Sequence, residues 1–211
     1  MKKVALSLLL TLFATIIMAQ ESQTEYNFLR LPVSAHAAAL GGDNITIIED
    51  DASMIFNNPA LLSSVSDNTI CLNYMNYMSG ANTASASYSR IIKECASVSA
   101  SAQFIDYGKM KEVNENNVQT GEFSAKDISV AGYFSYMLTD RLVGGITAKF
   151  VTSYICNYNS LAMGVDLGFN YYDSDKEWSL SLVAKNLGGQ LKAYNETYEK
   201  MPIDVQLGVS K

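Results

Sequence analysis

The chain has 211 residues, of which 48% are hydrophobic and only 17% are charged, and its formal net charge is −6. This acidic balance argues against a nucleic-acid-binding protein, because such proteins carry a basic surface for the phosphate backbone. High apolar content with little charge, at a mean hydropathy of +0.05, suits either a soluble globular domain or a membrane β-barrel.

Residues 1–19 have the organisation of a secretory signal peptide. Lys2 and Lys3 form a positive start, residues 4–18 form an apolar run, and Ala19 offers a small residue for cleavage. A single membrane anchor is the alternative, but the run is shorter than the ~20 apolar residues that a spanning helix needs. We therefore expect the mature chain to be exported.

The segment 20–67 fits neither a regular strand nor one long helix. Its central part, from Phe28 to Leu62, is interrupted by small residues and is rich in Asn, Asp, Gly and Pro. Because an irregular backbone needs partners for its polar groups, we expect this segment to lie inside a barrel as an N-terminal plug. The candidate plug residues are Ser34, His36, Gly41, Gly42, Asn57, Asn58 and Pro59.

Two residue pairs in the plug segment carry local predictions. We expect Gly41 and Gly42 to form a sharp turn in which the backbone angle φ is positive. Asp50 and Asp51 could suggest a metal site, but adjacent acids before Ala-Ser more often cap a helix. We therefore predict a helix that starts at Ala52, and no metal.

The sequence carries no recognisable catalytic or cofactor-binding motif. It has a single His, no Gly-x-Ser-x-Gly motif, no phosphate-binding loop and no paired-Cys motif. We therefore expect a protein that is not an enzyme and that uses no cofactor.

From residue 68 onward, apolar and polar residues alternate with a period of two, which predicts strands with two different faces. Most of these segments are close to the ~9–11 residues of a tilted membrane strand. We expect about eight strands, at 69–78, 84–93, 95–105, 127–138, 142–154, 160–169, 178–182 and 203–210.

An antiparallel transmembrane β-barrel fits this pattern better than a soluble sandwich. Several strands exceed the ~5–6 residues usual in a globular sheet, and their polar face is dominated by Gly, Ser and Ala. Short predicted turns alternate with two long predicted loops, Gly108–Ala125 and Gly188–Met201. Outer-membrane barrels have short periplasmic turns and long extracellular loops, so we assign both long loops to the outside.

Residues 68–211 are not expected to form a closed barrel that also holds a plug. An eight-stranded barrel is filled by its own side chains, and an open sheet edge in lipid leaves costly unpaired backbone groups. We therefore expect residues 68–211 to be part of a larger barrel that continues beyond Lys211. A closed eight-stranded barrel with its N-terminal segment in the periplasm is the alternative.

Three charged residues are predicted to point together into the barrel lumen. If the hairpin turns are tight four-residue turns, Lys149 faces Asp166 and Gly164 faces Lys185, which places Lys185 diagonal to Asp166. The three charges share the face opposite the apolar residues of their strands. A lone charge facing lipid at mid-membrane costs ~2–4 kcal/mol, so this face should be the lumen. The charges are either plain lumen lining, which we favour, or a ligand site.

Several short motifs in the plug segment occur together in one known family. They are Phe28-Leu29, Ser34-Ala35-His36-Ala37, Leu40-Gly41-Gly42, Asp50-Asp51 and Asn57-Asn58-Pro59-Ala60. Over residues 26–63 the chain resembles the PorV/PorQ branch of the FadL-like outer-membrane proteins, and it is closer to the PorQ-like members. One departure is His36, which stands where the family usually has Arg and which, unlike Arg, does not keep a permanent charge.

The resemblance implies a fourteen-stranded outer-membrane barrel with an N-terminal plug. It further implies a place in the attachment complex of the type IX secretion system of Bacteroidetes-type bacteria, where the barrel anchors a surface subunit beside a sortase. The expected partners are these secretion proteins and outer-membrane lipid. FadL-like relatives suggest an alternative function, the transport of hydrophobic small molecules.

The predicted loop 188–201 is a candidate partner-binding loop. Tyr194 and Tyr198 lie there among Asn and Glu residues, a composition suited to protein contact. A plain solvated turn explains the composition equally well.

Overall fold

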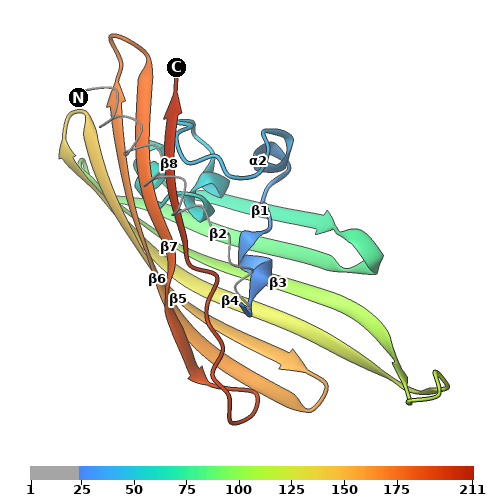
Figure 1. Cartoon of the computed structure of the whole chain (residues 1–211). Coiled ribbons are helices and arrows are strands. Elements are labelled where there is room, and N and C mark those ends of the chain that lie inside the picture. Colours follow the sequence, from blue (N-terminus) through green and yellow to red (C-terminus); the bar gives the residue numbers. More distant parts are fainter. Residues whose placement is uncertain (1–23) are drawn as a thin grey trace, which may run out of the picture.

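A computed structural model describes residues 24–211, and the predicted signal peptide lies outside these described residues. The described chain is all-β, with eight antiparallel strands in a single sheet whose order follows the sequence (Figure 1). Within residues 24–211, no helix is long and apolar enough to cross a membrane. The strands are β1 (Thr69–Asn76), β2 (Asn82–Lys93), β3 (Ala96–Val113), β4 (Gln119–Thr139), β5 (Leu142–Ile155), β6 (Tyr158–Asp173), β7 (Trp178–Lys192) and β8 (Asp204–Ser210).

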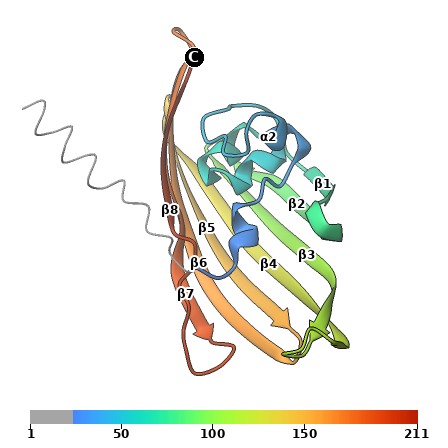
Figure 2. The same ribbon diagram turned by 45° about the vertical axis from the view of Figure 1, so that its right-hand side comes forward.

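The sheet is curved but not closed. Its two edges are β1, which pairs only with β2, and β8, which pairs only with β7. Both views show the resulting trough, with one concave and one convex face (Figures 1 and 2).

The two faces of the sheet differ sharply in polarity, which confirms the predicted alternation. The convex face exposes large apolar side chains, among them Leu72, Phe134, Ile146, Phe150, Leu182 and Leu207. The concave face carries buried small polar side chains, among them Ser87, Ser99, Ser129, Thr147 and Ser181. Because side chains alternate along a strand, the sequence period alone separates these two sets.

The two predicted long loops are shorter than expected, so these predictions are wrong in part. Most of Gly108–Ala125 is a hairpin extension, because β3 continues to Val113 and β4 begins at Gln119. Most side chains of this extension are exposed, so no apolar alternation marks it as strand. In the same way β7 continues to Lys192, which leaves residues 193–203 as the connection to β8.

Short helices in the N-terminal part of the chain lie against the concave face (Figure 2). They are η1 (Asn27–Arg30), α2 (Ala35–Ala39), η2 (Ala52–Phe56) and η3 (Pro59–Ser64), and a further turn, η4 (Met78–Gly80), joins β1 to β2. Side chains at three N-caps accept a backbone N–H, namely Ser34, Asp51 and Asn58. The predicted helix start at Ala52 is confirmed, as a short 3₁₀ helix capped by Asp51.

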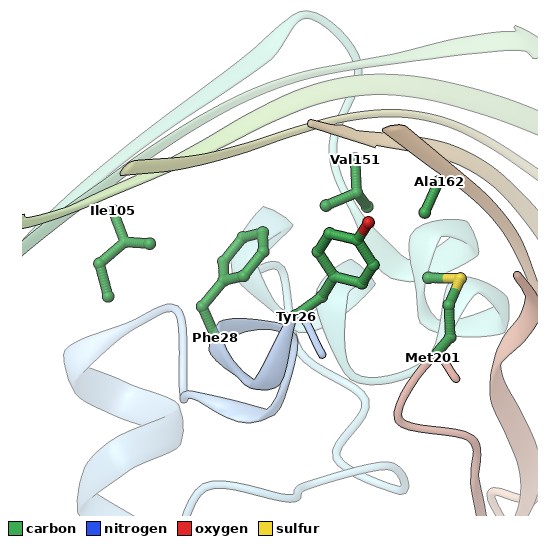
Figure 3. Packing of buried hydrophobic residues seen from close by; sticks show 6 residues of the cluster. All are labelled: Tyr26, Phe28, Ile105, Val151, Ala162 and Met201. Carbon is green, nitrogen blue, oxygen red and sulfur yellow. The ribbon is translucent and has the colours of Figure 1, made fainter. Parts of the chain in front are cut away.

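Two apolar clusters hold the N-terminal segment against the sheet. One joins Tyr26 and Phe28 to Ile105, Val151 and Met201 (Figure 3). The other packs η2 and η3 against β4, and its buried members are Ala52, Ile55, Leu62, Val65, Ala131 and Tyr133. Burial of apolar side chains therefore fixes both ends of the segment on the concave face.

Candidate functional site

The turn before η3 is deeply buried. Asn58 is 0% exposed, its amide nitrogen donates to the Ile45 carbonyl at 2.9 Å, and its side-chain oxygen accepts from the Ala60 N–H at 2.9 Å. Pro59 follows as the first residue of η3, where its missing N–H costs nothing. Asn58 and Pro59 together begin the helix. The Asn58 side chain also provides hydrogen-bond partners for the buried Ile45 carbonyl and Ala60 N–H.

Two glycines of the sheet make room for this turn. Gly145 in β5 and Gly168 in β6 are direct register partners. A Cβ atom on Gly145 would collide with the backbone of Pro59 and Ala60, and one on Gly168 would collide with Asn58 and Pro59. The sheet therefore contacts the turn through bare backbone. Sequence reasoning missed this contact, although both glycines stand on the predicted polar face.

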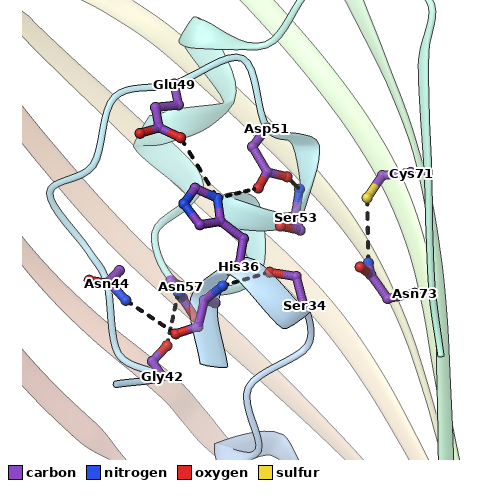
Figure 4. Close-up of polar contacts among 11 residues, drawn as sticks. Ser34, His36, Gly42, Asn44, Glu49, Asp51, Ser53, Asn57, Cys71 and Asn73 are labelled. Atoms are coloured by element: carbon purple, nitrogen blue, oxygen red, sulfur yellow. Dashed lines mark hydrogen bonds and ion pairs between the residues drawn. The ribbon is translucent and has the colours of Figure 1, made fainter. Parts of the chain in front are cut away.

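A second turn, at Gly41-Gly42, closes the loop above α2. The φ angles of the two glycines are 98° and 97°, which confirms the predicted positive values. The Gly42 carbonyl accepts a hydrogen bond from the Asn57 side chain at 3.2 Å (Figure 4). The predicted plug residues Gly42 and Asn57 therefore meet in space, and Ser34 caps α2 nearby.

The single histidine pairs with an acidic residue inside the N-terminal segment. His36 Nδ1 lies 3.1 Å from Asp51 Oδ2 and 3.7 Å from Glu49 Oε2 (Figure 4). Burial alone would raise the pKa of Asp51, but hydrogen bonds from Ser53 and His36 outweigh burial and lower it. Asp50 instead accepts from Ser66, whose N–H and hydroxyl lower the pKa of Asp50.

The three charged residues predicted to lie together are all buried on the concave face, as their positions in the alternating pattern predict. They are Lys149, Asp166 and Lys185. Lys149 Nζ lies 2.7 Å from Asp166 Oδ2 and donates to Asn186 Oδ1 at 2.9 Å. The Asn186 N–H in turn donates to Asp166 Oδ1 at 2.7 Å, and its side chain reaches the Pro202 carbonyl. Asn186 therefore joins the ion pair to the chain that leads into β8.

The predicted register of β5 and β6 is wrong by two residues. Lys149 pairs with Gly164, so it lies diagonal to Asp166 and not directly opposite. The turn consists of Cys156 and Asn157 alone, because Cys156 adopts a φ of 52°. Two-residue hairpin turns need such positive angles, and a Cys at this position gives no sequence signal for one.

The predicted pairing of Gly164 with Lys185 is also wrong. Gly164 pairs with Gly188, and the register shifts across residues 165–167. Asn186 takes the extra position with a φ of 59°, a conformation that Asn tolerates. This β-bulge brings both Lys185 and Asn186 to the buried face, which simple alternation does not allow.

Lys185 lies beside two cavities between the sheet and the N-terminal segment. The smaller has a volume of about 20 Å³ and the larger about 270 Å³, and both are lined by Leu29, Arg30, Asp43 and Lys185. A volume of 20 Å³ holds about one water molecule. The larger cavity has room for several water molecules.

The two candidate partner-binding tyrosines face different environments. Tyr198 is 64% exposed, whereas Tyr194 is half-buried. Burial raises the pKa of Tyr194, although its neighbours Ser153 and Ser160 act in the opposite direction. Only Tyr198 is therefore presented to solvent for contact with another protein.

The chain matches no family model and no curated protein sequence. Its fold class is therefore defined by the sheet topology and by the contacts between the sheet and the N-terminal segment. It is an all-β protein with one open, curved antiparallel sheet, whose concave face is covered in part by an irregular N-terminal segment.

Proposed function

We propose that the chain forms the wall and the N-terminal plug of an outer-membrane β-barrel. One observation carries this proposal: the convex face of the sheet is apolar, whereas its concave face is polar and buried beneath the N-terminal segment. Membrane barrels face lipid with one side of each strand and line their lumen with the other. In a soluble sandwich, the apolar sides of the strands would instead face each other in a core.

The open edges of the sheet set a further requirement. β1 and β8 each have one side without a strand partner within residues 24–211. In a bilayer, unpaired backbone groups at such edges cost several kcal/mol each, so in the proposed barrel both edges are paired with strands. The resemblance to the PorV/PorQ branch puts the total at fourteen.

Within that branch, the proposed role is that of a membrane anchor in the type IX secretion attachment complex, which holds a surface subunit beside the sortase. The cavities beneath the N-terminal segment support an anchor over a transporter of hydrophobic molecules. They are lined largely by charged and polar side chains, including Lys185, Asp43 and Ser129. A route for an apolar substrate would need an apolar lining.

The first test concerns the barrel. The tagged full-length protein, expressed in a Bacteroidetes-type host, should appear in the outer membrane and should run faster on gels before heating than after it. Recovery from the soluble periplasmic fraction, without heat-dependent mobility, would contradict the barrel proposal.

The second test concerns the anchor. Deletion of residues 195–198, which removes exposed Tyr198 and leaves β7 intact, should reduce co-purification of the surface subunit and the sortase. Deletion of the equally exposed hairpin tip 114–117 is the matched control. If both deletions leave co-purification unchanged while the barrel still forms, the loop that contains residues 195–198 is not the partner site.

A further inference from the structure

The part of the N-terminal segment from residue 34 to residue 65 is held together by its own contacts. These residues, which include α2, η2 and η3, are called the α2–η3 unit below. The Asn57 side chain donates to the Gly42 carbonyl at 3.2 Å (Figure 4). The Asn58 side chain donates to the Ile45 carbonyl at 2.9 Å. An apolar cluster within the unit joins its three helices, and its buried members are Ala37, Met54 and Leu61.

The α2–η3 unit is joined to the sheet by very little hydrogen bonding. Within residues 24–211, one hydrogen bond connects it to a strand, from the Ser179 hydroxyl to the Thr46 carbonyl at 2.8 Å. No ion pair connects the unit to a strand in this part of the chain. The unit is therefore held on the sheet mainly by the apolar cluster that packs η2 and η3 against β4.

The chain on both sides of the unit is attached to the sheet separately. Before the unit, the Tyr26 hydroxyl lies 2.8 Å from Ser160 Oγ and accepts from the Gln190 side chain at 3.0 Å. After the unit, the Asp67 carboxylate accepts from the Ile91 N–H of β2 at 2.8 Å. Both ends can therefore stay in place when the unit between them moves.

Four buried hydroxyl groups lie where the unit meets the sheet, and none has a hydrogen-bond partner among residues 24–211. They are Ser53 of η2, Ser87 of β2, Ser135 of β4 and Thr147 of β5. Ser135 is the register partner of Gly145, at which η3 contacts the sheet, and η2 contacts β2. A buried hydroxyl without a partner is costly, whereas the same group in contact with water is satisfied. Separation of the unit from the sheet therefore satisfies groups that docking leaves unpaired.

We propose that the α2–η3 unit separates from the concave face as one body, while residues 24–31 and the strands keep their places. Hydration of the four hydroxyl groups offsets part of the apolar contact that is lost. The separation uncovers the concave face of β4 and β5. In the barrel proposed above this face lines the lumen, so that consequence rests on the proposed function. The separation itself depends only on contacts within this chain.

Hydrogen–deuterium exchange of the purified full-length protein tests this inference. A combined variant, Ser87→Ala with Ser135→Ala and Thr147→Val, removes the three unpaired hydroxyl groups of the sheet and changes side-chain volume little. The amides of residues 52–64 should then exchange more slowly by ~10-fold or more, because docking no longer leaves these groups unpaired. Exchange in residues 26–31 should not change.

Ser160→Ala is the matched control. It also removes a buried hydroxyl group from the sheet, but that group is bonded to Tyr26 outside the unit. Exchange in residues 52–64 should therefore stay as in the unaltered protein. Equal or faster exchange of these amides in the combined variant would overturn the proposal.

If the combined variant does not fold, thiol labelling carries the test. After replacement of the three native cysteines, Ser135→Cys places a thiol beneath the unit, and Val151→Cys places one beneath Tyr26 and Phe28. Both positions are almost fully buried, at 1% and 0% exposure. Under native conditions a maleimide should label the first variant ~10-fold or more faster than the second, because the unit opens locally. Equal labelling rates would overturn the proposal.

Discussion

Gly145 of β5 and Gly168 of β6 face each other across the sheet and form the surface on which the Asn58-Pro59 turn lies. Neither glycine is needed for its own backbone angle, because neither has a positive φ. Both are needed because the turn approaches too closely for any side chain. Gly145 and Gly168 therefore mark the part of the sheet that the N-terminal segment contacts.

Replacing either glycine by alanine should loosen this docking. A Cβ atom on Gly145 meets the backbone of Pro59 and Ala60, and one on Gly168 meets the buried Asn58 side chain and the Pro59 ring, so Gly145→Ala and Gly168→Ala should each cost ~1–3 kcal/mol. Hydrogen–deuterium exchange should show faster exchange of the amides in residues 52–64, by roughly tenfold or more. Gly132→Ala is the matched control, because a Cβ there has no atom within 4 Å. Equal exchange in all three variants would contradict the close contact.

The Lys149–Asp166 pair should behave as a coupled unit. Removing one partner, in Lys149→Met or Asp166→Asn, should destabilise the protein by ~3–5 kcal/mol, because the other charge stays buried without its counter-ion. The double variant should be less destabilised than the sum of the two single variants. Urea unfolding of all four proteins measures this coupling. Strictly additive effects would mean that the two charges do not interact.

The Asp51 carboxylate should make a pH-dependent contribution to stability. Its folded pKa is lowered by the hydrogen bonds from Ser53 and His36, so this contribution is present above the ordinary value of 3.8 and is lost as the pH falls below it. Asp51 is partly exposed, so we expect only ~0.5 kcal/mol after solvent screening.

Asp51→Asn isolates this contribution, because Asn still caps η2 but does not titrate. The difference in unfolding free energy between the unaltered protein and the variant should be larger at about pH 6 than at about pH 3. A difference that does not change with pH would show that the carboxylate charge has no role.

The sequence predicted the faces of the sheet but not its register. Faces follow from a period of two, so Lys149, Asp166 and Lys185 were all assigned to the correct side. Register depends on turn length and bulges, and these arise from positive φ angles at Cys156 and Asn186. Cys gives no sequence signal for a positive φ and Asn gives a weaker one than Gly, and therefore both predicted pairings were wrong.

The N-terminal segment was predictable in its turns and caps but not in its contacts. The positive angles of Gly41 and Gly42, and the cap at Asp51, follow from short-range chemistry. The docking of Asn58 onto Gly168 joins residues far apart in the chain, and a glycine on the polar face of a strand does not say what covers it. The role of Asn186 was missed because it depends on the β-bulge, which simple alternation does not predict.

The most direct test of the proposed barrel is the environment of the convex face. Nitroxide labels at Phe134 and Phe150, introduced after replacement of the three cysteines, would lie on that face, and a label at Asn116 would lie at an exposed hairpin tip. In lipid vesicles, the labels at Phe134 and Phe150 should be accessible to oxygen and shielded from a polar nickel complex, and the label at Asn116 should show the reverse. Labels at Phe134 and Phe150 that are as accessible to the nickel complex as the label at Asn116 would contradict a membrane barrel.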